Sequence, residues 1–465
     1  MKFVMKFGGA SLANGEKIRH VAQLLKKYHD DGNEIVVIVS ALFGVTDKLI
    51  ANAAKISRKD KTKHIDEFIE SIKELHYDAI AVAITDKNIK KETIKIIDDK
   101  LKYLKRAFIG ICYLGELSTR SIDYISSYGE RLSVPIVNGA IRSLGIESGS
   151  YTGGEIGIIV NNSKNQLEFE TIYERINAKL NPVLKSEIPV IAGFIAENKD
   201  GIVKTLGRGG SDFSASIVGS ALKVDEIILW KEVHGIMTSD PKIVPDAKLI
   251  PKISYIEAME LSYFGAKVLH PLSIEPAIKK KIPVRVKNIF EPDFDGTLIV
   301  SNNIHDKDVV RAISLIDEVS LLNISGVGMF GVPGVIARVF TVLANAGVNI
   351  IMISQGSSEA NISIVIDDAY IDLIISEIVL EFENDIPLKV TKDKDISVIA
   401  VVGLGMTGLP GVSGRVFSAL GNNHINVIMI SQGSSQHNIS FVVKEKDAIN
   451  SVQILSNEFK LGCNS

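Results

Sequence analysis

Cysteine is scarce in this sequence: only Cys112 and Cys463 occur among 465 residues. Two thiols are too few for a disulfide framework or a thiolate metal centre, and such scarcity is typical of a reducing compartment. No run approaches the ~20 apolar residues that a membrane helix requires, and the first residues lack the apolar segment and cleavage site of a signal peptide. We therefore expect a cytoplasmic protein without a membrane anchor.

An excess of one charge is also missing. The chain has 52 basic and 55 acidic residues, a formal net charge of −3, and no basic run, so nucleic acid is not an expected partner. No His/Cys/Asp cluster has the spacing of a structural zinc site, and we expect no protein-held metal. Apolar residues are plentiful at 46%, and the length allows roughly three domains of about 100–200 residues each.

The C-terminal third contains a tandem repeat. Residues 326–366 match residues 403–443 at an offset of 77, and 25 of the 41 positions are identical. Residues 335–345 have helical periodicity, whereas 349–354 and 362–366 are β-branched runs. Each copy therefore predicts strand, glycine loop, helix, strand, turn and strand, and two copies indicate a pair of α/β domains rather than a solenoid.

Upstream of about residue 305, apolar β-rich runs alternate with helical stretches. The predicted strands are 2–7, 34–40, 188–194, 226–230 and 282–287, and the predicted helices include 16–30, 118–144 and 212–222. Strands that are buried on both faces and separated by helices favour a largely parallel sheet between helical layers. The polar residues 301–308 are the expected join to the repeats.

Residues 205–212, Thr-Leu-Gly-Arg-Gly-Gly-Ser-Asp, are the most informative stretch. They follow a predicted strand and open a predicted helix, which we expect Ser211 and Asp212 to cap. The glycines allow close approach of an anion, Arg208 supplies a cation, and the amides of a helix start favour phosphate or carboxylate. The alternative is an ordinary glycine-rich turn with a solvated arginine.

A second glycine turn, Lys6-Phe7-Gly8-Gly9-Ala10-Ser11, directly follows the first predicted strand. Its lysine lies at the carboxyl end of a strand, the edge at which open α/β sheets bind ligands. Taken alone, the turn could be a tight strand-to-helix connection. Together with residues 205–212 it favours a site for an anionic substrate.

Five motifs occur in order along the chain. They are residues 6–11, 37–46 (VIVSALFGVT), 128–133 (YGERLS), 205–212 and 263–271 (YFGAKVLHP), followed by the repeats. This set resembles the aspartate kinases of the amino-acid kinase superfamily. The resemblance implies an α/β fold, in which a three-layer αβα sandwich with a mostly parallel sheet (1–304) precedes two ACT-like βαββαβ modules (305–392 and 393–465). In that family a strand near 309–315 can complete the second module.

The implied reaction is phosphoryl transfer from ATP, accompanied by Mg²⁺, to the β-carboxylate of L-aspartate. Its product, 4-phospho-L-aspartate, leads towards lysine, threonine and methionine. A carboxylate with a reference pKa of about 4 is ionised at pH 7, so the nucleophile needs no general base. Two anions must be brought together, and catalysis then depends on positioning and charge neutralisation.

The resemblance also assigns roles to residues. Lys6 would lie against the transferred phosphoryl group, and Asp212 would orient it. Arg208 suits the α-carboxylate of aspartate, because a guanidinium matches carboxylate geometry, and Glu130 suits the α-ammonium. The remaining aspartate-binding residues implied are Ser40, Ala41, Thr46, Phe194 and Ser211.

Two of these assignments have structural alternatives. Glu130 could pair with neighbouring Arg131, and Thr46 could cap a helix that starts near Asp47.

The implied nucleotide-binding residues are Lys6, Gly8, Gly9, Ser11, Lys231, Glu232, Met237, Asp240, Lys242, Lys267, Val268 and Leu269. Glu232 replaces the usual aspartate and Met237 the usual tyrosine, and both changes alter the shape of the implied ribose and base pocket.

The repeats imply regulation, since ACT modules bind small amino acids and pair across chains. The expected effector-binding residues are Asn349, Ile350, Gln355 and Asn361 in the first copy and Asn426, Gln432 and Asn438 in the second. Turn chemistry is an equal alternative for the amides. We expect a dimer or tetramer inhibited by lysine, threonine or both.

Two other functions stay open: a kinase of the superfamily acting on glutamate, carbamate or a nucleoside monophosphate, and a non-catalytic amino-acid sensor.

Overall fold

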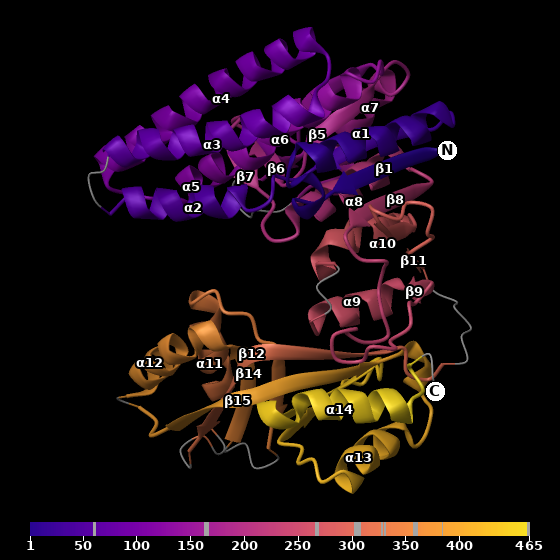
Figure 1. The fold of residues 1–465 in the computed structure, drawn as a ribbon. Helices are drawn as coiled ribbons and strands as arrows, with labels where there is room; N and C mark the ends of the chain where they lie inside the picture. Colours follow the sequence, from indigo (N-terminus) through magenta and orange to yellow (C-terminus); the bar gives the residue numbers. More distant parts are fainter. Residues whose placement is uncertain are drawn as a thin grey trace. The chain divides into compact units, whose positions relative to one another are not determined.

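The computed structural model describes residues 1–58, 62–161, 167–265, 269–301, 308–326, 329, 332–356, 361–383 and 385–462. Contacts divide the chain into two compact units (Figure 1). Unit 1 comprises Met1–Gly235, Pro251–Ile253 and Leu269–Asn302, and unit 2 comprises Ile236–Ile250, Ser254–Val268 and Asn303–Ser465. Two segments upstream of residue 304 thus group with the C-terminal unit. No helix within the described ranges is long and apolar enough to cross a bilayer.

The core of unit 1 is an eight-stranded sheet in the order β3-β5-β2-β1-β8-β10-β11-β9. Its parallel strands are β3 (Ser148–Thr152), β5 (Ile188–Ala192), β2 (Glu34–Val39), β1 (Lys2–Phe7), β8 (Glu226–Lys231) and β10 (Val284–Asn288), and β11 (Thr297–Val300) runs antiparallel to β10. The short strand β9 (Lys252–Ser254) ends the sheet. The strands are β-branched and almost wholly buried, as a parallel sheet between helical layers requires.

Helices cover both faces of this sheet. Alternate residues of β1 (Phe3, Met5 and Phe7) share one apolar core with helices on one face: α1 (Gly15–Asp30), α2 (Val45–Ile56), α3 (Thr62–Ala83), α4 (Lys87–Leu114), α5 (Thr119–Ser126) and α6 (Tyr128–Arg142). On the other face α8 (Gly210–Leu222) packs against β1 and β8, beside α7 (Phe169–Val183) and α10 (Glu275–Lys280). Because strand side chains alternate, Lys6 lies on the face that α8 covers.

A small three-stranded sheet adjoins α5. It consists of β4 (Ile159–Val160), β6 (Ile195–Asn198) and β7 (Val203–Thr205), and β6 and β7 form an antiparallel hairpin. The single helix predicted over 118–144 is two helices, α5 and α6, which meet at Ser127. The small sheet and the split between α5 and α6 place helix and strand ends close to the carboxyl edge of the main sheet.

Unit 2 contains a six-stranded sheet in the order β13-β14-β12-β15-β17-β16. Its two long central strands, β12 (Ala312–Ser325) and β15 (Lys389–Val402), pair antiparallel along their length. The first copy of the repeat supplies α11 (Val335–Asn345), β13 (Met352–Gln355), β14 (Asn361–Asp367) and α12 (Ile371–Phe382). The second supplies α13 (Val412–Asn422), β16 (Met429–Ser431), β17 (Asn438–Lys444) and α14 (Glu445–Glu458). The two copies therefore have the same element order.

The second module has no strand after α14 in the part of the chain that the structure describes, and a strand near 309–315 is the expected completion. The start of β12 supplies it: Ala312 to Ile316 pair with Val402 to Val398 of β15. Ile313 lies in one apolar core with residues of β17 and α13. The helix α9 (Tyr255–Tyr263) also belongs to unit 2, where Glu257 Oε1 accepts a hydrogen bond from the Leu404 amide at 3.1 Å.

Candidate active site

The carboxyl ends of β1 and β8 bring two lysines to one carboxylate. Lys6 Nζ lies 2.6 Å from Asp212 Oδ1, and Lys231 Nζ lies 3.0 Å from Asp212 Oδ2. The strands are adjacent and parallel, and Asp212 occupies the first turn of α8, where the positive end of the helix stabilises a carboxylate. Two ammonium groups and one carboxylate leave one positive charge uncompensated, which suits this cluster to a polyanion.

Burial and mutual attraction set the protonation of this cluster. Burial is the largest effect on Lys6 and lowers its pKa, while Asp212 opposes the change. Burial would raise the pKa of Asp212, but Lys6 and Lys231 outweigh it and hold that pKa well below its usual range. Asp212 therefore stays ionised and keeps both lysines oriented at neutral pH.

Glu130 lies in the first turn of α6 and is 4% exposed. Its Oε1 accepts a hydrogen bond from the Ala41 amide at 3.1 Å, whereas its Oε2 has no partner among the described residues. Burial raises the pKa of Glu130 to about 8, against the opposing effects of the Ala41 hydrogen bond and Lys6. The predicted alternative, a pair with Arg131, is wrong for the described structure, because the Arg131 guanidinium lies 5.6 Å from the Tyr128 ring centroid and makes no ion pair with Glu130.

Close packing holds α6 against the residues that follow β2. A Cβ atom at Gly129 would lie 2.7 Å from both Ala41 Cβ and Thr46 Oγ1, so only glycine allows this approach. Ser133 Oγ adds a hydrogen bond to the Ser40 carbonyl at 2.7 Å. Thr46 lies inside α2, which starts at Val45 after a left-handed Gly44, so the alternative capping role for Thr46 is wrong.

The glycine-rich segment starts α8 differently from the prediction. Gly209, with φ 70°, is the N-cap and the helix begins at Gly210, so Ser211 and Asp212 lie in the first turn and do not cap it. Arg208 is exposed and makes no ion pair among the described residues. Phe194, at the start of β6, has φ 65°, a costly conformation that a surrounding structure must hold.

These side chains line one pocket of about 510 Å³ in unit 1. Its lining residues are Lys6, Ser40, Thr46, Asp47, Ile50, Ile122, Ser126, Glu130, Phe194, Thr205, Gly207, Arg208, Gly209, Gly210, Ser211 and Asp212. Eight of the nine residues predicted for catalysis or aspartate binding are among them. The ninth, Ala41, is buried and contributes its amide to Glu130.

Sequence reasoning missed five side chains of this pocket: Asp47, Ile50, Ile122, Ser126 and Thr205. Their positions contain a weak signal. Asp47 and Ile50 are three apart on α2, and Ile122 and Ser126 are four apart on α5, so each pair shares one helix face. Nothing in these residue types indicates phosphate chemistry.

The predicted nucleotide residues are only partly brought together. A Cβ atom on Gly8 would lie 3.6 Å from Lys6 Nζ, so this backbone adjoins the ammonium. Glu232 instead pairs with Lys17, its Oε1 lying 2.6 Å from the ammonium. Gly9 and buried Ser11 form the start of the first turn after β1, and Leu269 is buried in unit 1.

Other predicted nucleotide residues lie outside unit 1 or outside the described structure. Met237, Asp240 and Lys242 belong to unit 2, where Asp240 Oδ1 accepts a hydrogen bond from the Lys242 amide at 2.9 Å. Lys267 and Val268 lie outside the described residues. Across the described ranges, no group of three or more His, Cys, Asp or Glu side chains could hold a metal ion.

Unit 2 has a pocket of about 520 Å³ in the first module. It is lined by Met329, Val332, Pro333, Gly334, Val335, Ile336, Ala337, Phe340 and Gln355. Of the residues predicted to bind an effector, Gln355 lines it, and Asn349, Ile350 and Asn361 do not. The sequence prediction emphasised strand-end amides and missed the start of α11.

The corresponding amides of the second module differ in their contacts. Asn438 Nδ2 donates a hydrogen bond to Glu260 of α9, and Gln432 Oε1 accepts one from Ser413 Oγ at 3.2 Å. Asn426 is exposed. Asn438 therefore already has a hydrogen-bond partner within unit 2. Its equivalence to Asn361 in the repeat did not predict this contact.

Comparison with known proteins gives consistent matches. The profile of the amino acid kinase family matches residues 1–288, and that of the ACT domain matches 322–381 and 399–459. Aspartokinase 2, chloroplastic, of Arabidopsis thaliana is 34% identical over 468 residues, covering 98% of this chain and 84% of that protein. A bifunctional aspartokinase/homoserine dehydrogenase of Buchnera aphidicola is 35% identical, covering 98% of this chain. The chain spans only about half the length of such bifunctional relatives, 56% in that case.

Solved structures agree with these matches. E. coli aspartokinase III in complex with aspartate and ADP superposes with a TM-score of 0.81 at 26% identity, covering 98% of this chain and 99% of that one. The complex of the same enzyme with lysine and aspartate gives a TM-score of 0.81 at 27% identity, with the same coverage.

Proposed function

The chain belongs to the amino acid kinase family, and on that premise we propose that it transfers the γ-phosphoryl group of ATP to the β-carboxylate of L-aspartate. The products are 4-phospho-L-aspartate and ADP. One observation carries the proposal: a single pocket is lined by Lys6 and Asp212 together with Glu130 and Arg208. Lys231 adds a second ammonium group to this cluster through its ion pair with Asp212. Relatives named aspartokinase, and the aspartate and ADP of the E. coli complex, support it.

The chemistry follows from the charges. A β-carboxylate oxygen attacks the γ-phosphorus, a new P–O bond forms, and the P–O bond to ADP breaks with its electrons leaving on the β-phosphate. No proton has to move, because the nucleophile is ionised at pH 7. Lys6 and Lys231 lower the repulsion between the two anions, and Asp212 keeps both lysines in place, so catalysis rests on positioning and charge.

Recognition of aspartate requires partners for its α-groups. Glu130 offers a buried oxygen without a protein partner to the α-ammonium, and Arg208 offers a bidentate donor to the α-carboxylate. Mg²⁺ would come with ATP and neutralise phosphate charge. Asp212 is already shared by two lysines, which fits an ion held mainly by phosphates and water rather than by the protein.

We propose that the first ACT module binds a small amino acid and controls turnover. Its pocket of about 520 Å³ is large enough for such a ligand, and the E. coli enzyme has been solved with lysine. Lysine, threonine or both are the proposed effectors, in a homo-oligomer joined through the ACT modules. Such control fits an early step towards lysine, threonine and methionine. A cytoplasmic location is supported by the presence of only two cysteines, which is typical of a reducing compartment.

The direct test is ADP formation by the purified chain with ATP, Mg²⁺ and one of three acceptors: aspartate, glutamate or none. We expect turnover with aspartate alone, and its decrease on addition of millimolar lysine or threonine. Turnover with glutamate instead would indicate another kinase of the family, and amino-acid binding without turnover would indicate a sensor. Indifference to both amino acids would refute the proposed effectors.

A further inference from the structure

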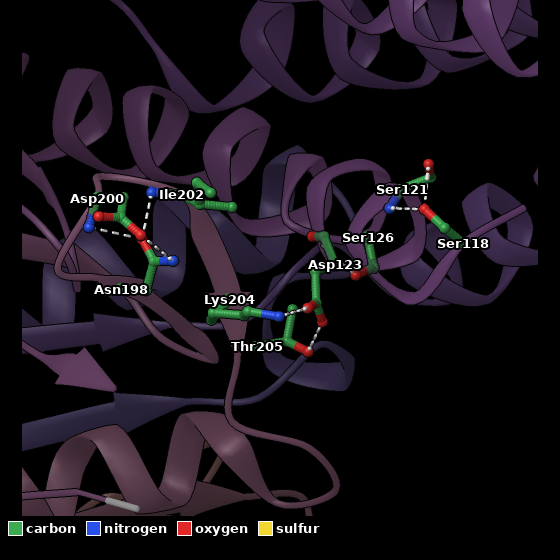
Figure 2. Close-up of polar contacts among 9 residues, drawn as sticks. All are labelled: Ser118, Ser121, Asp123, Ser126, Asn198, Asp200, Ile202, Lys204 and Thr205. Atoms are coloured by element: carbon green, nitrogen blue, oxygen red, sulfur yellow. Dashed lines mark hydrogen bonds and ion pairs between the residues drawn. The ribbon is translucent and has the colours of Figure 1, made fainter. Parts of the chain in front are cut away.

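A buried carboxylate outside the catalytic cluster ties two walls of the pocket together. Asp123 of α5 is 8% exposed, and its Oδ1 accepts a hydrogen bond from Thr205 Oγ1 of β7 at 2.6 Å (Figure 2). Lys204 Nζ lies farther away, 3.4 Å from Asp123 Oδ2, and its side chain is 27% exposed. Both groups contact the same carboxylate, and the Thr205 hydrogen bond is much the shorter of the two contacts.

The strand that Asp123 holds belongs to a hairpin that connects two parts of the pocket wall. Phe194 directly precedes β6, and the Arg208 loop directly follows β7. The far end of the hairpin is closed by its own contacts, because Asn198 Oδ1 accepts hydrogen bonds from the amides of Asp200 at 3.0 Å and Ile202 at 2.8 Å (Figure 2). The hairpin is therefore internally fixed, and Asp123 attaches its base to α5.

The α5 side of the Asp123–Thr205 hydrogen bond also belongs to the wall of the pocket. Ile122 and Ser126, on either side of Asp123 in α5, line the pocket, and so does Thr205 itself. Ser126 Oγ also donates to the Asp123 carbonyl at 3.2 Å. The Asp123–Thr205 hydrogen bond thus joins two wall segments that are 82 residues apart in the sequence.

We infer that Asp123 is a positioning residue for the aspartate subsite. It fixes β7 against α5, and thereby fixes the point at which the chain leaves β7 for Arg208. The inference rests on the proposed function. The phosphoryl-transfer cluster lies on β1, β8 and α8, so loss of this contact affects aspartate capture more than the chemical step.

The substitution that removes the contact is Thr205→Val, which keeps the shape and β-branching of this pocket-lining side chain and removes the hydroxyl. We expect the KM for aspartate to rise about tenfold, the size expected for loss of one charge-assisted hydrogen bond, while kcat and the KM for ATP stay within about twofold. Thr205→Ser restores the hydroxyl and the native KM. The matched control, Thr171→Val at an exposed site of α7, changes none of these constants.

Hydrogen exchange supplies a readout that does not need the reaction. Without substrate, peptides covering residues 203–208 exchange faster in Thr205→Val than in the native and Thr205→Ser proteins. A native KM for aspartate in Thr205→Val, or a uniform loss in all constants that serine does not restore, overturns the inference. If the native protein does not phosphorylate aspartate, the proposed function fails, and exchange decides the positioning role: unchanged exchange overturns it and faster exchange supports it.

Discussion

Glu130→Gln has opposite effects on stability and on substrate binding. The pKa of Glu130 rises from an ordinary 4.5 to about 8, mainly because the side chain is buried. A raised carboxyl pKa means that the group's contribution to stability is complete below about pH 4.5 and is lost as the pH rises through 8. The native side chain keeps its proton up to about pH 8, whereas the unfolded one releases it near pH 4.5. The native state is therefore destabilised by about 3 kcal/mol at pH 7 and about 4 kcal/mol at pH 8.

Glutamine resembles the protonated carboxyl and avoids this cost. Its amide oxygen can still accept the Ala41 hydrogen bond. We expect urea unfolding to show similar midpoints for both proteins at pH 5 and a more stable variant at pH 8. The KM for aspartate rises about a hundredfold at pH 8, since a hydrogen bond between charged groups contributes up to about 3 kcal/mol. A variant no more stable than the native protein at pH 8, or one with an unchanged KM for aspartate, would refute the reasoning.

Three further predictions follow from the same packing and charges. Asp212→Asn leaves two lysines without their counterion and lowers the free energy of unfolding by about 3–5 kcal/mol with loss of turnover; an unchanged denaturation midpoint would contradict the buried ion pair. Arg208→Lys replaces a fork of donors by a point charge and raises the KM for aspartate about tenfold with little change in kcat, and steady-state kinetics that show no change would exclude the bidentate role. Gly129→Ala destabilises the protein by about 1–3 kcal/mol in thermal unfolding, whereas Gly110→Ala, where a Cβ meets no atom within 4 Å, does not, and equal effects would argue against the close approach.

Most of the residues that line the pocket in unit 1 could be predicted because they are concentrated in short motifs. Lys6 and Asp212 belong to glycine-rich segments at the carboxyl ends of strands, and a parallel sheet brings such ends to one edge. The roles expected of Glu130 and Arg208 came from the family resemblance, and their residue types suit an ammonium and a carboxylate. The α/β class and the paired C-terminal domains followed from the strand pattern and the repeat, and the resemblance identified those domains as ACT modules, which the family profiles confirm.

The remaining features depend on packing that residue types do not encode. Ser211 and Asp212 are favourable capping residues, but a left-handed Gly209 begins α8 and leaves Asp212 available for the lysines. The last strand of the second module comes from the start of β12, a pairing between distant segments that only the family resemblance led us to expect. Thr205 belongs to the motif at residues 205–212, but its hydrogen bond with Asp123 could not be predicted, because Asp123 lies on another element.

The central claim is that an aspartate carboxylate oxygen attacks phosphorus in this pocket. The most direct measurement uses L-aspartate with ¹⁸O in both β-carboxylate oxygens, together with ATP, Mg²⁺ and hydroxylamine, which cleaves an acyl phosphate at carbon and leaves the bridging oxygen on phosphate. We expect inorganic phosphate that carries one ¹⁸O atom, detected by ³¹P NMR, together with aspartyl hydroxamate. Unlabelled phosphate without hydroxamate would show that water, and not the carboxylate, takes the phosphoryl group.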